Sequence, residues 1–181
     1  MRRKKAIGLV TLVSAAVIAV VGALLPRSFS VERRRVVKAS ADKVYAIAAD
    51  LSRHPEWNAR KARDASMSFT YPAATRAGKG AVYEWTSQNS GAGRCEIVEA
   101  VPNERIALHV SLGGRGSGGT AEWRFARVPG GTEIARSFEA EIPVPILGGW
   151  ILLFMHPKTQ LALDFETELE RFAAVAETSP K

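Results

Sequence analysis

The clearest pattern of apolar and polar positions lies in the last part of the chain. After Lys158 apolar residues recur three or four positions apart, which is the spacing of one buried helical face. Between Glu141 and Lys158 there is no Asp, Glu, Lys or Arg. We therefore predict one long helix over 145–177, kinked at Pro157 because proline has no backbone N–H. Its apolar face is predicted to hold Leu161, Phe165, Leu169 and Phe172, with Asp164, Glu166, Glu168, Glu170 and Arg171 as the polar positions between them.

Runs of alternating apolar and polar residues, typical of half-buried strands, occupy the middle of the chain. Glycine, proline and asparagine separate these runs, and short links of this kind join antiparallel neighbours. Two short helices are predicted within 40–57, with Ser40 as the N-cap. Because the helix over 145–177 is so apolar, we expect a curved sheet closed over it with an apolar cavity between them. The predicted strands cover 29–38, 67–71, 81–87, 94–100, 105–112, 120–128 and 132–142.

The N-terminal segment 6–25 has twenty residues and contains nothing more polar than Thr11 and Ser14. A helix of this length and composition can cross a bilayer core. A cleavable signal peptide, with the small residues 21–23 as its cleavage site, remains an open alternative. The predicted organisation is a basic N-terminus and transmembrane anchor over 1–25, a linker over 26–28, a domain over 29–177 and a tail over 178–181.

Basic residues flank this apolar segment on both sides. The four residues of 2–5 immediately precede it, whereas Arg27 alone is equally close on the other side. We therefore expect a single-pass protein with its domain on the extracytoplasmic side. Without residues 2–5 the net charge falls from +7 to +3, from 21 basic against 18 acidic side chains. A mildly basic domain without a basic stripe interleaved with exposed aromatic residues predicts no nucleic-acid partner.

Residues that bind metals or perform nucleophilic catalysis are few. Cys95 is the single cysteine, so no intramolecular disulfide or thiolate metal cluster can form. No two of the three histidines stand at metal-ligand spacing, and we expect neither a metal nor a cofactor. His54 is predicted to lie on a surface turn and His109 to point outward from its strand. His156, next to the predicted kink, either serves the kink alone or contacts a ligand.

The stretch 114–119 contains a formal G-x-G-x-x-G pattern. A dinucleotide-binding loop of that kind opens a helix, whereas here a strand follows. We interpret this stretch as a hairpin loop, and as a possible gate if it lies at the mouth of the cavity.

The order of strand, two short helices, six strands and long helix resembles the START-like, or SRPBCC, superfamily, in its branch of polyketide cyclases, dehydrases and lipid-transport proteins. The resemblance implies an α+β helix-grip fold, in which an antiparallel sheet of about seven strands wraps around the C-terminal helix. Two departures are that Asn58 follows Trp57 and that Arg136 replaces an apolar residue of the last strand. The stretches that resemble the superfamily are 44–57, 80–85, 93–102, 105–106, 131–132 and 164–169.

Aromatic side chains and one arginine are the candidates for contact with a ligand. Arg136 shares strand parity with its apolar neighbours, and an inward charge needs a partner such as Glu84, Tyr83, His156 or an anionic ligand. A β-bulge that turns Arg136 to solvent remains equally open. The predicted ligand-binding residues are Trp85, Trp123, Phe125, Phe138, Arg136, Trp150, Phe154 and Phe165.

Three functions are compatible with this pattern. The first is a membrane-tethered domain that binds or transports a lipid or other apolar small molecule, with the bilayer contacted through 6–25. The second, which the resemblance implies, is an enzyme of the polyketide cyclase or aromatase kind, with Arg136 orienting a carbonyl or carboxylate and Tyr83 donating a proton. The third is an interaction module whose apolar helix packs on a membrane-protein partner. The sequence leaves the oligomeric state open.

Overall fold

A computed structural model describes residues 2–113 and 117–179, and the side chains of 11–113 and 118–179. The strands are β1 (Ser28–Val37), β2 (Ser68–Thr70), β3 (Val82–Ser87), β4 (Gly91–Val101), β5 (Arg105–Leu112), β6 (Ser117–Val128) and β7 (Gly131–Glu141). The helices are α1 (Arg2–Leu24), α2 (Ala41–Ala49), the 3₁₀ helix η1 (Leu51–Glu56), α3 (Ala59–Arg63), α4 (Gly148–Met155) and α5 (Pro157–Thr178).

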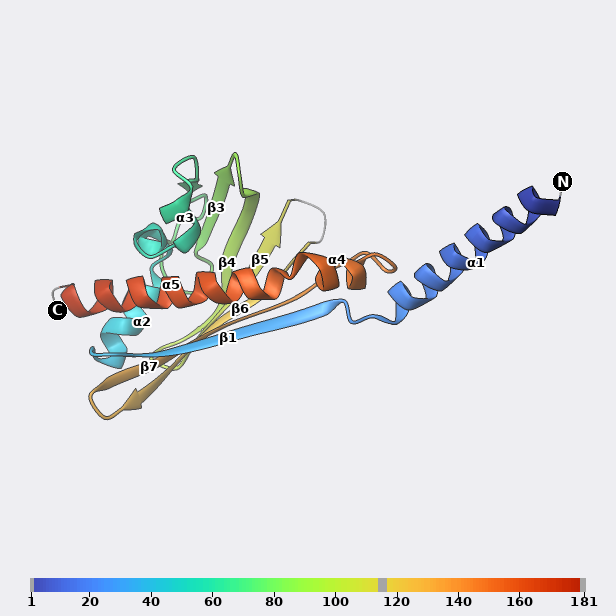
Figure 1. The fold of residues 1–181 in the computed structure, drawn as a ribbon. Helices are drawn as coiled ribbons and strands as arrows, with labels where there is room; N and C mark the ends of the chain where they lie inside the picture. Colours follow the sequence, from blue (N-terminus) through green and yellow to red (C-terminus); the bar gives the residue numbers. More distant parts are fainter. Residues whose placement is uncertain (1, 114–116, 180–181) are drawn as a thin grey trace.

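The seven strands form one antiparallel sheet in the order β1-β7-β6-β5-β4-β3-β2. The first strand thus pairs with the last one, and the strands between them follow one another in sequence order. The helix α5 runs across the sheet, with α2, η1 and α3 beside it (Figure 1). This arrangement confirms the predicted α+β helix-grip fold.

Register on β7 decides where its side chains point. Arg136 pairs with Arg33 of β1 and Trp123 of β6, and neither ladder is interrupted there. The bulge that would turn Arg136 to solvent is therefore absent at this position. The register shift that the sheet does contain lies between Ile97 and Glu99, where β4 meets β5.

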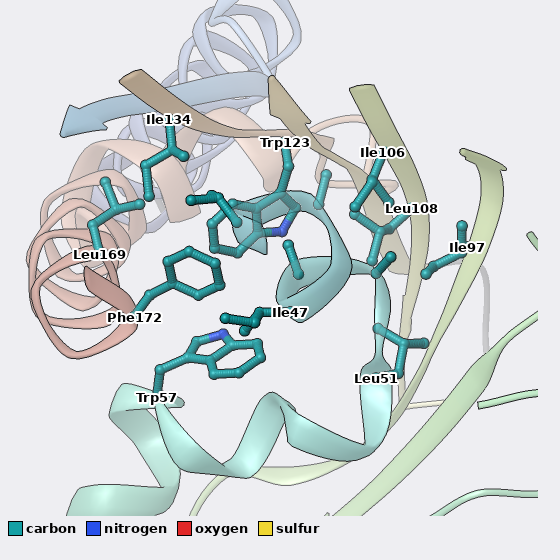
Figure 2. Packing of buried hydrophobic residues seen from close by; sticks show 14 of the residues in the cluster. Ile47, Leu51, Trp57, Ile97, Ile106, Leu108, Trp123, Ile134, Leu169 and Phe172 are labelled. Atoms are coloured by element: carbon teal, nitrogen blue, oxygen red, sulfur yellow. The ribbon is translucent and has the colours of Figure 1, made fainter. Parts of the chain in front are cut away.

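The hydrophobic core lies between the sheet and the helices. Phe172 of α5 packs between two tryptophans, with ring centroids 5.0 Å from Trp57 and 5.1 Å from Trp123 (Figure 2). Burial of such large apolar side chains is the main contribution to stability. Trp57 belongs to the stretch after η1, so the core joins the helical segment before the strands to the helix after them.

The predicted helix over 145–177 is wrong in one respect, because it is two helices. α4 ends at Met155, α5 begins at Pro157, and His156 between them has the left-handed backbone values φ 46° and ψ 46°. Proline disfavours helical geometry in the residue before it and is well suited to the first turn of a new helix. Pro157 therefore ends one helix and begins another instead of kinking a continuous one.

The helix α1 extends away from the sheet, and its C-terminal part contacts α4 (Figure 1). Over the part of the chain that is described, no helix meets the length and apolarity needed to cross a membrane. The anchor over 1–25 stays a prediction. The tip of the G-x-G-x-x-G stretch, residues 114–116, lies outside the described residues, as do 180–181 of the predicted tail.

Candidate ligand-binding cavity

A cavity of about 400 Å³ lies between the sheet and α5. Its apolar walls come from β1, β2, β3, β5, β6 and β7 on one side and from α4 and α5 on the other. Polar side chains of η1, α3, α5 and β7 complete the wall. The lining residues are Phe29, His54, Asn58, Arg60, Met67, Phe69, Tyr83, Trp85, Val110, Leu112, Ala121, Arg136, Phe138, Met155, Pro157, Gln160, Leu161, Asp164, Phe165 and Glu168.

Arg136 crosses from the sheet to α5 and forms an ion pair with Glu168. The two side chains are only 12% and 5% exposed, so the pair is shielded from water. The guanidinium carbon lies 5.0 Å from the Trp123 ring centroid and 4.5 Å from that of Phe165, in cation–π geometry. Glu168 also accepts a hydrogen bond from the backbone N–H of Ala59, at 3.3 Å. One ion pair thus ties β7, α5 and the start of α3 together.

Arg136 has the carboxylate partner that an inward charge requires, and Tyr83 lines the same cavity, but Glu84 and His156 lie elsewhere. Glu84 lies on the other face of its strand, where its carboxylate is 3.3 Å from Arg94. His156 is exposed at the break between α4 and α5. Glu168 was predicted as a polar position of α5, yet it follows Phe165 by three residues and therefore faces the cavity with it.

Asp164 is a second buried carboxylate on α5 and was also predicted as a polar position of that helix. It accepts hydrogen bonds from Arg63 at 2.6 Å and Gln160 at 3.0 Å, and its other oxygen is 3.7 Å from Arg60. With Arg136 and Glu168, three guanidinium groups thus face two carboxylates. Of these five groups, Arg63 lies outside the cavity wall, so the two arginines and two carboxylates of the wall balance in charge.

His54 is buried, which corrects its expected place on a surface turn. Its ring stacks on Tyr83, with centroids 4.7 Å apart and planes at 21°, and meets Trp57 and Phe69 edge to face. His54 and Leu51 are the buried residues of the 3₁₀ helix η1, which also contains Pro55. His109, in contrast, is exposed on its strand as predicted.

Burial determines the protonation states of His54 and Tyr83. It lowers the pKa of His54 to about 3, assisted by the nearby charges of Arg136 and Arg60. Burial also raises the pKa of Tyr83 well above its usual value. At neutral pH the imidazole is therefore an uncharged, weak base, and the phenol keeps its proton.

Three nitrogen atoms on residues of the cavity wall are buried without a hydrogen-bond partner. They are His54 Nδ1, Trp85 Nε1 and Arg136 Nε. A buried polar atom left unpaired typically costs about 1–3 kcal/mol. Two of these atoms are donors, so an acceptor group on a ligand is the chemistry that would complete them after a small local adjustment.

The predicted ligand-binding residues fall into three places. Trp85, Arg136, Phe138 and Phe165 lie on the cavity wall, together with Tyr83. Trp123 and Phe125 belong to the core instead, where their rings stack 6.5 Å apart and Phe125 also packs on Tyr45.

Trp150 and Phe154 do not line the cavity. Their rings stack on each other 5.9 Å apart on α4, which ends before the break at His156. The polar residues His54, Asp164 and Glu168 were missed as wall residues. Asp164 follows Leu161 by three residues, and Glu168 follows Phe165 by three. This helical spacing is the signal in the sequence that indicates their inward position.

The chain matches the family described as polyketide cyclase / dehydrase and lipid transport over residues 28–177. It therefore belongs to this family. The helix-grip fold and the cavity between sheet and helix agree with this assignment. No curated protein matches the sequence.

Solved structures share the fold at low sequence identity. Protein CV1439 from Chromobacterium violaceum is 18% identical with a TM-score of 0.61, over 83% of this chain and 98% of that one. Protein SA2116 from Staphylococcus aureus, described as of unknown function, is also 18% identical with a TM-score of 0.61, over 83% and 94%. DynU16, described as a protein of the dynemicin biosynthetic locus, is 17% identical with a TM-score of 0.57, and the match covers 82% of this chain but 47% of DynU16. Likeness at this level of identity shows the fold alone.

Proposed function

We propose that this domain binds a lipid or another apolar small molecule between its sheet and α5, and carries it without changing it chemically. The observation that carries this proposal is the cavity of about 400 Å³ with mainly aromatic and aliphatic walls. Small-molecule sites typically enclose roughly 300–1,000 Å³ and combine apolar walls with a few polar groups.

The distribution of polar groups favours an amphipathic ligand. Phe29, Phe138 and Leu161 pack together on one part of the wall. The ion pair of Arg136 and Glu168 lies at another part, next to the start of α3. An apolar chain or ring fits the first part, and a carbonyl or carboxylate fits beside the guanidinium.

We also propose that residues 6–25 tether the domain to a bilayer in a single pass, with the domain on the extracytoplasmic side. Twenty residues without a charged side chain support this. Apolar side chains are also exposed along the described part of α1, namely Leu12, Val13, Val17, Ile18, Val20, Val21 and Leu24.

The test is extraction and mass spectrometry of the molecules that copurify with the full chain in polymer-bounded bilayer discs. Val110→Trp fills the cavity, and Val36→Trp adds the same side chain on the exposed face of β1 as a matched control. We expect one class of compound to be enriched with the wild type and with Val36→Trp, and depleted with Val110→Trp. Identical extracts from all three proteins would show that the cavity holds nothing.

A second candidate is an enzyme of the cyclase kind. It is favoured by one observation, that Arg136 and Tyr83 line the same cavity while Tyr83 keeps its proton at neutral pH. Arg136 would hold a carbonyl or carboxylate and the Tyr83 hydroxyl would donate a proton to the developing oxyanion. Tyr83→Phe should then abolish turnover of a poly-β-ketone substrate while leaving its binding intact. Absence of turnover by the wild type would remove this candidate.

A further inference from the structure

The helix α4 is an apolar surface element without a protein partner on its outer side, among the described residues. Phe154 and Met155 are 72% and 73% exposed, and Leu147 and Leu153 are also exposed. No Asp, Glu, Lys or Arg occurs from 142 to 157. Large exposed apolar patches of this kind mark interaction surfaces.

Close contacts hold α4 against the end of α1. Trp150 Nε1 donates a hydrogen bond to the backbone oxygen of Ile18, at 3.3 Å. A Cβ at Gly22 would clash with Trp150 and with the backbone oxygen of Ile146, and a Cβ at Gly149 would clash with Leu25. The glycines thus allow the two segments to touch, and the apolar surface of α4 continues that of α1.

The uncharged run is bounded in the sequence by Glu141 and Lys158, and a second basic residue, Arg27, lies against its first part. Arg27 lies beside Gly148 and forms an exposed ion pair with Glu141 at 3.3 Å, and Lys158 follows Pro157 on α5. Basic side chains that flank an apolar segment suit the headgroup layer of a membrane with anionic lipids. Tryptophan, here Trp150, is also favoured at that depth.

The same element forms part of the cavity wall. Met155, the last residue of α4, and Pro157, the first of α5, both line the cavity with Leu161 and Phe29. Met155 is at once largely exposed and a wall residue, so the cavity reaches the outer surface at the break between α4 and α5. His156, with its left-handed backbone, lies at that break.

We propose that α4 lies in the headgroup and acyl-chain boundary of the bilayer, and that the cavity opens there through a portal lined by Met155, Pro157 and Leu161. A ligand then passes between bilayer and cavity without crossing water. This inference rests on the proposed function and adds the route of exchange and the surface that docks on the lipid. Because Phe154 is on α4 outside the cavity, its role is in contact with the lipid and not in retention of the ligand.

The first experiment locates α4 in vesicles of phosphatidylcholine with a minority of phosphatidylglycerol. A bimane fluorophore is attached at Phe154→Cys in the full chain, and at Val36→Cys as the control. Cys95 does not interfere, because it is buried. Val36 lies toward the other end of β1, roughly 26 Å from Ser28 at about 3.3 Å per residue. Doxyl-labelled phosphatidylcholine should quench the probe at 154 and leave that at 36 unchanged.

Three other outcomes would contradict the inference, and each identifies a different part of it as wrong. If the chain floats with the vesicles but the probe at 154 is quenched only by aqueous iodide, the tether stands and the portal is wrong. A probe shielded from both quenchers would indicate a second copy of the chain on α4, which also overturns the inference. A chain that does not float overturns the tether and the portal together.

The second experiment measures transfer of anthroyloxy-stearate from vesicles to the protein. Phe154→Asp should slow transfer by about tenfold or more, because a carboxylate among acyl chains must be desolvated, while occupancy at equilibrium stays unchanged. Val36→Asp should have no effect. Unchanged transfer by Phe154→Asp contradicts the portal, whereas a wild type that never takes up the probe contradicts the proposed binding function instead.

Discussion

Arg136 on β7 and Glu168 on α5 form an ion pair beside the cavity, with the guanidinium between the rings of Trp123 and Phe165. This pair connects the last strand to the long helix and places a guanidinium group against two aromatic rings. Because the pair is buried, removal of either side chain leaves the other charge buried without a counterion. We therefore expect Arg136 to contribute to stability, and the proposed function also places it in contact with the ligand.

Removing one partner of this pair should destabilise the fold. We expect Arg136→Met to lower the free energy of unfolding by about 3–5 kcal/mol, because Glu168 is left buried without a counterion. The double variant Arg136→Met with Glu168→Leu should recover most of that loss. Arg94→Met, which breaks exposed pairs with Glu84 and Glu96, should cost at most about 1 kcal/mol. Urea denaturation measures all three, and equal losses for Arg136→Met and Arg94→Met would show that the pair is not shielded.

The buried imidazole of His54 should make stability depend on pH. Its pKa is about 3 in the folded protein, against an ordinary value of 6.5, so between these values the unfolded chain binds the extra proton. Stability contributed by this residue is therefore complete above pH 6.5 and falls as the pH drops toward 3, by about 1.4 kcal/mol per pH unit. His54→Phe should flatten this part of the profile. Parallel pH profiles for the two proteins, measured by urea denaturation, would contradict the assignment.

Cys95 should be unreactive in the folded protein. Burial raises the pKa of its thiol to about 12, and the thiolate is the form that reacts. A colorimetric disulfide reagent at neutral pH should label Cys95 only after unfolding, whereas an introduced Val36→Cys should react at once. Rapid labelling of the folded wild type would mean that β4 opens readily.

The backbone at His156 provides a test of the break between α4 and α5. A non-glycine residue in the left-handed region is typically strained by about 1–2 kcal/mol, which glycine avoids in part. His156→Gly should leave stability unchanged or raise it by up to about 1 kcal/mol. His156→Val should lower it, because a β-branched side chain tolerates this conformation poorly. A continuous helix would give the opposite order in thermal unfolding.

The strand pattern could be predicted well, because alternation and turn residues are local properties. The segment 105–112 was predicted with both of its ends, whereas the parity of Arg136 with Ile134 and Phe138 left an inward side chain and a β-bulge equally open. The partner of Arg136 could not be predicted in this way. Glu168 lies 32 positions further on, and only the packing of α5 across the sheet brings the two together.

The C-terminal segment shows what apolarity alone leaves undetermined. Trp150 and Phe154 were predicted as cavity residues because they are aromatic and lie in an uncharged run. Their rings stack on each other, and Trp150 also contacts α1, since His156 separates α4 from α5. A hydrophobic pattern indicates that a face is shielded from water, and the element that shields it depends on the tertiary structure.

The central claim is that an apolar ligand occupies the space between the sheet and α5. The most direct measurement is photo-crosslinking of the full chain in vesicles with an alkyl diazirine, followed by peptide mass spectrometry. The account predicts adducts on Val110, Leu112, Phe138 and Leu161, and their loss in Val110→Trp while adducts on exposed residues of α1 persist. Adducts confined to α1 and the outer side of α4, with none on the cavity wall, would contradict it.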